Sequence, residues 1–298
     1  MILTLTDVSK RFGAHYALCG VSLQVQRGEI LGIVGPDGAG KTTLLRIIAG
    51  ALAPSAGRVD SEAGRSQVGY LSQHFSLYPD LTVWENVTFF ARVYGLHDQA
   101  IRRRGRYLLE WVGLWDVRER LAAQLSGGMK QKLSLACALV HQADLMLLDE
   151  PTTAVDPLSR REFWDLIQDL IRNRTTVLVS TPYMEEADRC HRVAFLSEGS
   201  LLACDTPAAL RGRLAHAVLE VRSHSLRRAE LEQAALRIPG ALSANAFGDA
   251  VHIMLPRRLS DQELAAALAG LPELTVRPIP PSLEDVFIGM INRGEVSA

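Results

Sequence analysis

The chain has 298 residues, 48% apolar and 22% charged, which is the composition of a globular protein with room for about two domains. Its 32 Lys and Arg residues balance 33 Asp and Glu residues, whereas a protein that coats nucleic acid usually carries a basic excess. No apolar run exceeds six residues, far short of the roughly 20 that a membrane-spanning helix needs. These numbers exclude a chain that crosses a bilayer and argue against one that coats nucleic acid.

The first residues, MILTLTDVSKRF, have no basic start followed by an apolar stretch, so they do not resemble a secretory signal. We therefore expect a cytoplasmic protein. The four cysteines are widely scattered and form no CxxC pair, which suggests neither a zinc site nor a disulfide framework. We expect them to be small buried apolar residues, and they are Cys19, Cys137, Cys190 and Cys204.

Residues 1–214 alternate short β-branched runs with glycine turns and helical stretches, a pattern typical of an α/β domain with a largely parallel sheet. Between residues 80 and 142 the pattern becomes almost wholly helical, which predicts a helical subdomain inserted into the α/β core. The candidate strands are 29–34, 145–148, 176–180 and 192–196.

Residues 215–298 are predicted to form a second, small α+β domain. Its elements follow the β-α-β-β-α-β order of ferredoxin-like folds. They are a strand at 217–222, a helix at 226–236, strands at 241–246 and 250–255, a helix at 261–268 and a strand at 274–279.

A last helix is expected after Pro280 and Pro281, with Ser282 as its N-cap and Asp285 three residues further on. Apolar side chains at i, i+3, i+4, i+7 and i+8 predict one buried face, docked within its own chain rather than on a partner. These side chains are Leu283, Val286, Phe287, Met290 and Ile291.

Residues 35–42 read GPDGAGKT, a full match to the phosphate-binding pattern G-x-x-x-x-G-K-[ST], between an apolar strand and a helix. The glycines let successive backbone NH groups face inward, and the following helix adds the positive end of its dipole. Lys41 can then reach the terminal phosphates of a bound nucleotide, and the Thr42 hydroxyl can ligate magnesium. The candidate nucleotide-binding residues are Gly35, Pro36, Asp37, Gly38, Ala39, Gly40, Lys41, Thr42 and Thr43.

Residues 145–150 read LMLLDE, an apolar strand that ends in two acids. Asp149 at the carboxyl end of the strand suits magnesium coordination, directly or through water. Glu150 can orient or polarise an attacking water, and the candidate catalytic residues are Glu150, Lys41 and Gln73. Alone, an Asp-Glu pair fits a solvated turn or a helix start equally well, and the phosphate loop makes the functional interpretation the stronger one.

Residues 125–131, LSGGMKQ, resemble the signature of ATP-binding cassette (ABC) proteins, and the rest of residues 1–214 fits that family in order. The resemblance implies that the signature faces the γ-phosphate held by an opposite cassette, through Leu125, Ser126, Gly127, Gly128 and Gln131. It implies that Phe12 stacks on adenine and that Gln73, in YLSQ, links the magnesium site to the helical subdomain and the membrane partner. It also implies that the loop containing Asp156 crosses the dimer interface. Seen alone, Phe12 fits a core aromatic, Gln73 a surface residue and Ser126 a plain helix cap.

The tail PSLEDVFIGMI, with TVWENVTFFARVYGL and EPTTAVDPLSRREFW, looks like the ATPase subunits of drug- and polysaccharide-type bacterial exporters of the ABC-2 type. That resemblance implies ATP as substrate and Mg²⁺ as cofactor. It also implies a separate membrane-spanning permease, a second cassette from the same or a different chain, and a location on the inner face of the cell membrane. No nucleic-acid partner is expected.

The match fails at one position, where the family usually has a histidine that contacts the γ-phosphate and this chain has Pro182. Proline has no side-chain donor and no backbone NH, so it cannot supply that hydrogen bond. We expect Thr181 to cap a helix that begins at Pro182, with His191 about 13 Å further along the same helix at 1.5 Å per residue. The loss of such a donor costs about 10²–10³ in rate, so the chain's own site should bind ATP and turn over slowly.

The leading interpretation is therefore an ATP-binding, ATP-hydrolysing subunit of a membrane exporter. An ATP-binding regulatory subunit with little turnover differs from it only at Pro182. A soluble ABC-type protein that acts on nucleic acid or ribosomes is a further alternative, although such proteins usually fuse two cassettes and carry basic insertions. The arginines at 102–104 and 106 fit a solvated helix face better than a basic insertion.

Overall fold

The computed structural model describes the chain except for residues 154, 215–216, 224–225, 239, 257–258, 261, 264–273 and 293–298. It divides into two compact units, and the boundary between them lies between Thr206 and Pro207. From the sequence we expect the boundary after residue 214. The difference has a simple cause, because helix α7 (Pro207–Arg213) packs against α10 (Leu283–Asn292) of the second unit.

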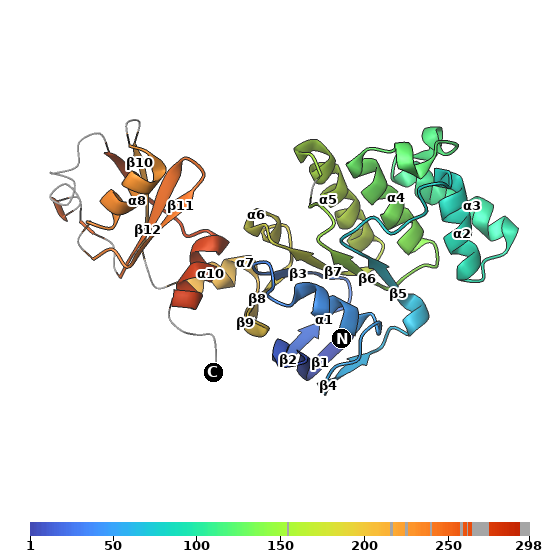
Figure 1. Ribbon diagram of the computed structural model, residues 1–298, viewed down its shortest axis with the longest axis horizontal. Coiled ribbons are helices and arrows are strands. Elements are labelled where there is room, and N and C mark those ends of the chain that lie inside the picture. The colour runs from blue at the N-terminus through green and yellow to red at the C-terminus, as the bar shows by residue number, and fades with distance from the viewer. Residues whose placement is uncertain are drawn as a thin grey trace. The chain divides into compact units, whose positions relative to one another are not determined.

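The centre of the first unit is a six-stranded sheet in the order β5-β6-β7-β3-β8-β9, parallel except for its last strand (Figure 1). Strands β3, β6 and β7 consist wholly of buried residues, as expected for parallel strands covered on both faces. The predicted strands are confirmed to within one residue at each end. The bounds are β3 (Ile30–Val34), β5 (Val68–Leu71), β6 (Leu145–Asp149), β7 (Thr176–Thr181), β8 (Arg192–Ser197) and β9 (Ser200–Asp205).

A second sheet of the first unit is antiparallel, in the order β2-β1-β4, with β1 (Leu3–Phe12), β2 (His15–Val25) and β4 (Ala56–Ser61). Helix α1 (Lys41–Ile48) shares one hydrophobic core with both sheets. In that core Leu44 and Leu45 join Leu5 of β1 and Leu147 of β6. Each fully buried leucine contributes about 1.5–3 kcal/mol, so this core holds α1 against both sheets.

The inserted helical subdomain is confirmed by α2 (Val83–Val93), α3 (Asp98–Trp111) and α4 (Gly127–Leu139). Helix α2 begins with a capping box, because the Thr82 hydroxyl accepts from the Glu85 NH and the Glu85 carboxylate accepts from the Thr82 NH. The three helices pack on one another, and α4 also packs against edge strand β5 (Figure 1). Helix α5 (Pro157–Arg172) and the single turn α6 (Met184–Ala187) complete the unit.

The four cysteines differ in how far they are buried. Cys137 and Cys190 are buried as expected, but Cys204 is only partly buried and Cys19 is exposed, so the expectation is wrong for Cys19. Across the helices that the structure describes, none is both long enough and apolar enough to cross a membrane.

The second unit contains a four-stranded antiparallel sheet in the order β11-β12-β10-β13. Strand β12 lies between β10 and β11, the two strands that α8 connects, which is the split arrangement predicted from the sequence. The predicted helix at 261–268 falls largely outside the described residues. The bounds are β10 (Ala217–Ser223), α8 (Arg228–Ala235), β11 (Ser243–Phe247), β12 (Ala250–Leu255) and β13 (Leu274–Ile279).

Helix α10 is held to this sheet by a buried His–Asp pair. His252 of β12 places its Nδ1 atom 3.0 Å from an Asp285 carboxylate oxygen, and both side chains are buried. Ser282 caps the helix as predicted, since its Oγ accepts from the Asp285 NH at 3.1 Å while its own NH donates to Asp285 at 2.8 Å. The predicted buried face is confirmed for four of its five positions, and Ile291 is half-buried.

Replacement of Asp285 by alanine should destabilise the second unit by about 2–3 kcal/mol, because it removes a helix-cap partner and leaves His252 buried without its acid. Burial raises the pKa of Asp285, but hydrogen bonds from His252 and Ser282 outweigh it and hold this pKa below its ordinary value. The stabilisation is therefore present above about pH 4 and is lost as pH falls through the lower folded-state pKa. Urea unfolding with hydrogen exchange in α10 measures this, and equal stability of both proteins at pH 7 would contradict it.

Candidate nucleotide-binding site

The phosphate loop lies between β3, which ends at Val34, and α1, which begins at Lys41. A Cβ atom on Gly35 would lie 2.0 Å from the Leu196 carbonyl oxygen, and one on Gly40 would lie 2.4 Å from that of Ala17. Gly40 also has a φ of +103°, which L side chains rarely adopt. The path of the loop is therefore set by close contact with two other backbone segments.

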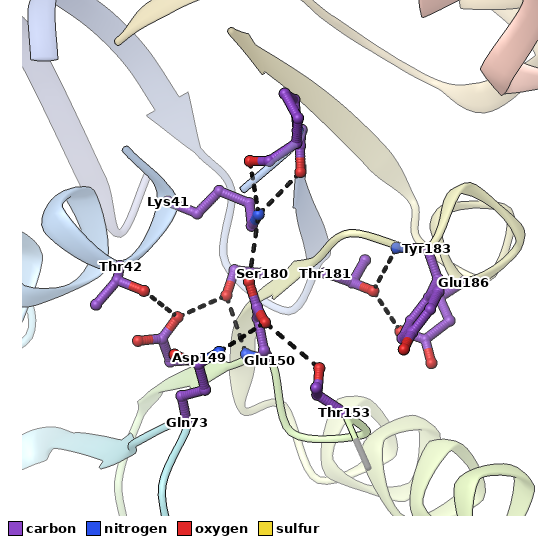
Figure 2. A network of polar contacts seen from close by, with 12 residues as sticks. Lys41, Thr42, Gln73, Asp149, Glu150, Thr153, Ser180, Thr181, Tyr183 and Glu186 are labelled. Atoms are coloured by element: carbon purple, nitrogen blue, oxygen red, sulfur yellow. Dashed lines mark hydrogen bonds and ion pairs between the residues drawn. The ribbon is translucent and has the colours of Figure 1, made fainter. Parts of the chain in front are cut away.

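Lys41 is buried at the end of this loop, with 4% of its surface exposed. Its ammonium lies 2.8 Å from the Gly35 carbonyl oxygen, 3.1 Å from that of Pro36 and 3.2 Å from Glu150 Oε1 (Figure 2). An ammonium group has three N–H donors, and here each has an acceptor. A phosphate that bound Lys41 would compete with these three acceptors.

Asp149 is the last residue of β6 and is fully buried. One of its carboxylate oxygens accepts from the hydroxyls of Thr42 at 3.0 Å and Ser180 at 2.8 Å (Figure 2). The other accepts from the Tyr70 hydroxyl at 3.0 Å. Burial and the nearby Asp149 carboxylate raise the pKa of Tyr70 to about 12, so Tyr70 is a protonated donor at neutral pH.

Glu150 is also buried and faces the phosphate loop. Its Oε2 atom accepts from Gln73 Nε2 at 2.9 Å and from the Thr153 hydroxyl at 3.4 Å, opposite the contact of Oε1 with Lys41. The backbone of Glu150 has a φ of +47°, in the left-handed region that a residue other than glycine enters at a cost of about 1–3 kcal/mol. Such strain persists only where the surroundings hold it, and here the Glu150 NH donates to Ser180 Oγ at 3.0 Å.

Two oxygen atoms that could act as magnesium ligands lie close together in the structure. The hydroxyl oxygen of Thr42 and a carboxylate oxygen of Asp149 are 3.0 Å apart beside the phosphate loop, and Mg²⁺ takes oxygen ligands together with water and substrate phosphates. The Gln73 side-chain amide donates to Glu150, so Gln73 contacts the carboxylate proposed to act on the attacking water. Its part in the metal site stays a prediction.

Of the residues assigned through family resemblance, Phe12 lies on the surface, and Ser126 and Asp156 lie at helix starts. Phe12 ends β1 with half of its surface exposed, and the Lys10 ammonium lies 5.2 Å from its ring centre. Ser126 caps α4 by accepting from the Met129 NH at 3.3 Å, and Asp156 caps α5 by accepting from the Ser159 NH at 2.9 Å. Within the described residues, no hydrogen bond or ion pair joins the signature to the phosphate loop.

The signature itself is half open to solvent. Ser126 and Gly127 are exposed, whereas Leu125, Gly128 and Gln131 are buried. A Cβ on Gly128 would lie 2.6 Å from the Ser159 side chain, so this glycine allows α4 to approach α5 closely. The exposed N-terminus of α4 is the kind of position that accepts an anion from outside.

The expected helix start at Pro182 is wrong. Strand β7 continues through Thr181, Pro182 lies in a bend, and α6 begins only at Met184. The Thr181 hydroxyl accepts from the Tyr183 NH at 3.0 Å and donates to the buried Glu186 carboxylate at 2.6 Å. The buried carboxylate and the sheet pairing of Thr181 with Val34 keep this residue in the strand.

His191 does not belong to a helix that continues from Pro182, so that expectation is also wrong. Helix α6 ends at Ala187, and His191 Nδ1 accepts from the Ile30 NH at 3.0 Å. Ile30 begins β3, whereas the phosphate loop follows the end of β3 at Val34. His191 therefore lies at the opposite end of the strand and cannot replace the missing imidazole.

Tyr70, Thr153 and Ser180 also belong to the site, and the sequence did not predict them. Tyr70 and Ser180 lie near the carboxyl ends of β5 and β7, the neighbours of β6 on either side. Polar residues at the ends of buried parallel strands are the signal that points to them, because ligands of such sheets bind at that edge. The strand order is needed before this signal can be used.

A glycine loop between a buried strand and a helix, a buried lysine, and a neighbouring strand that ends in Asp-Glu define a P-loop NTPase. A sequence model of the family described as ABC transporter matches residues 18–153. The Nod factor export ATP-binding protein I of Burkholderia orbicola is 35% identical over 298 residues, which cover 96% of each chain. This chain belongs to the ABC transporter family of ATP-binding proteins.

Two further comparisons agree with this assignment. The probable multidrug ABC transporter ATP-binding protein YbhF of Escherichia coli K12 is 36% identical over 97% of this chain, which spans about half (52%) of that relative. The dimeric post-hydrolysis structure of the ATP-binding cassette MJ0796 with ADP and Pi superposes with a TM-score of 0.64 at 28% identity. It covers 69% of this chain and 98% of that one.

The loop geometry predicts different effects for two glycine substitutions. Gly35→Ala should destabilise the first unit by about 3 kcal/mol and abolish nucleotide binding, because its Cβ collides with backbone that cannot rotate away. Gly38→Ala should cost about 1 kcal/mol, because its φ of +81° is strained but the space around it is open. Urea unfolding and binding of a fluorescent ATP analogue measure both, and equal effects of the two substitutions would contradict the geometry.

Proposed function

We propose that this chain is the ATP-hydrolysing subunit of a membrane exporter. It works with a second cassette and with a separate permease that anchors it to the inner face of the membrane. The network that joins Lys41, Thr42, Asp149 and Glu150 at one edge of the sheet carries the proposal. The names of the two relatives, which refer to multidrug transport and to Nod factor export, support the exporter assignment.

The site can bind and hydrolyse ATP by exchanging one ion-pair partner for another. The γ-phosphate takes the place of Glu150 at the Lys41 ammonium, while the loop amides and the α1 N-terminus hold the other phosphate oxygens. The released Glu150 carboxylate, still held by Gln73, can accept a proton from the attacking water. Thr42 and Asp149 would hold magnesium, whose charge stabilises the phosphate oxygens.

A second cassette completes the site. Ser126 and Gly127 are exposed at the N-terminus of α4, where backbone NH groups and the helix dipole favour an anion. In a dimer of cassettes this signature faces the γ-phosphate that the opposite loop holds. The structurally similar MJ0796 cassette was solved as a dimer, which supports that arrangement.

The second candidate, an ATP-binding regulatory subunit with little turnover, is favoured by one observation. Pro182 stands in the bend after β7, and a proline there offers neither a side-chain donor nor an NH to the γ-phosphate. The two candidates share the binding site and differ only in the rate of ATP turnover.

The third alternative is a protein that acts on nucleic acid or ribosomes. Co-purification of the full chain with an integral membrane protein would separate it from the first two.

Glu150→Gln should lower ATP turnover by about 10²–10⁴, because the amide cannot accept the proton from water. ATP should bind more tightly to this variant, since Lys41 no longer has a carboxylate to give up. Turnover with and without Mg²⁺ and binding of a fluorescent ATP analogue measure the two effects. Glu29→Gln is the matched control, because Glu29 is also buried but pairs with Arg192 at the opposite end of the sheet. Equal turnover of Glu150→Gln and wild type would overturn the proposed mechanism.

Pro182→His should raise ATP turnover of the chain, by up to about 100-fold, because it restores a donor near the γ-phosphate. Steady-state ATPase rates for wild type and variant, each alone and with a candidate partner cassette, test this. A wild-type chain that is fully active alone and gains nothing from histidine would show that its own site is not slow.

A further inference from the structure

We propose that Ser180 is a positioning residue for ATP hydrolysis, which holds the magnesium-binding Asp149 and the catalytic Glu150 in register through one hydroxyl group. The inference rests on the proposed function and concerns the same site. Ser180 is the fifth residue of β7 and is fully buried.

The sheet register brings Ser180 to both acids. Strands β6 and β7 are parallel neighbours, and Asp149 and Ser180 are paired in their register. The Ser180 hydroxyl lies 2.8 Å from an Asp149 carboxylate oxygen and 3.0 Å from the Glu150 backbone nitrogen (Figure 2). The contact follows from the pairing of these two strands.

The direction of these two hydrogen bonds is fixed. The Glu150 NH can only donate, so the Ser180 oxygen is the acceptor there, and its single hydrogen is left for Asp149. The Ser180 hydroxyl therefore accepts from the Glu150 NH and donates to the Asp149 carboxylate, so it bridges the two residues. Bonds to a buried carboxylate are charge-assisted and about twice as strong as neutral ones, which makes this bridge stiff.

The bridge acts where the backbone is strained. Glu150 has a φ of +47°, and its peptide NH is held by Ser180 through both the hydroxyl at 3.0 Å and the carbonyl oxygen at 3.2 Å. The direction of the Glu150 side chain toward Lys41 and Gln73 depends on that conformation. Loss of the Ser180 hydroxyl would loosen both acids at once.

Other hydroxyls of the site do not share this double role. Those of Thr42 and Tyr70 reach Asp149, and that of Thr153 reaches the Glu150 side chain. Ser180 alone among these four contacts both acids. Pro182 offers no donor to the γ-phosphate. The end of β7 therefore acts on Asp149 and Glu150 through the hydrogen bonds of Ser180.

The test compares Ser180→Ala with wild type in the full chain, with Thr181→Val as the matched control. Thr181 has an equally buried hydroxyl on the same strand, but it bonds Glu186 instead of the two acids. Two quantities are measured. One is the Mg²⁺ concentration that half-saturates binding of a non-hydrolysable fluorescent ATP analogue, and the other is the split of ATPase kinetics into kcat and KM.

For Ser180→Ala we expect the Mg²⁺ half-saturation to rise and kcat to fall by roughly 10-fold each, with analogue binding in EDTA unchanged because Lys41 and the loop are intact. Ser180→Thr, which keeps the hydroxyl, should restore both. Ser180→Cys keeps the size with a weaker hydrogen-bonding group and should lie between them.

The outcomes separate the two proposals. Wild-type Mg²⁺ dependence and kcat in Ser180→Ala and Ser180→Cys, or the same changes in Thr181→Val, would overturn the role of Ser180 while leaving the proposed function intact. A wild-type chain that shows no Mg²⁺-dependent binding of the analogue would overturn the proposed function itself, and the role of Ser180 with it.

Discussion

The ion pair between Lys41 and Glu150 is the interaction on which the site depends. Both charges are almost wholly removed from water, which is costly unless each finds enough partners. The ammonium has two loop carbonyls beside the carboxylate, and the carboxylate has Gln73 and Thr153. These contacts join the phosphate loop, the end of β6 and the segment after β5, so a phosphate that displaced Glu150 from Lys41 would change contacts in all three.

The strand order of the sheet brings these partners together. Parallel pairing in the order β5-β6-β7-β3 brings the carboxyl ends of four strands together, and three of them, β5, β6 and β7, carry a polar residue at or near that end. Three hydroxyls then surround Asp149, and one of them also fixes the strained peptide of Glu150. Preorganisation of this kind reduces what must reorder when the nucleotide arrives.

Contiguous motifs made much of this predictable from the sequence. Gly35 to Thr42, Asp149 and Glu150 carry their chemistry within a few residues, and apolar runs predicted the strands around them. Ser180 and Tyr70 were not predictable, because their contacts with Asp149 require the non-sequential strand order. The helix expected from Pro182 to His191 failed for a similar reason, since a buried Glu186 and sheet pairing override the local preference of proline for a helix start.

Comparison with a second buried acid shows why Lys41 is suited to exchange its partner Glu150 for a phosphate. Asp285 is bonded to His252 and to the Ser282 cap, within a helix start packed on the second unit's sheet, and nothing among the described residues opens this pair to solvent. Lys41 also is buried, but Pro36, Asp37 and Gly38 of its own loop are exposed beside it. In the proposed exchange an anion would approach Lys41 over the loop and replace Glu150, whereas the buried pair in the second unit holds a helix in place.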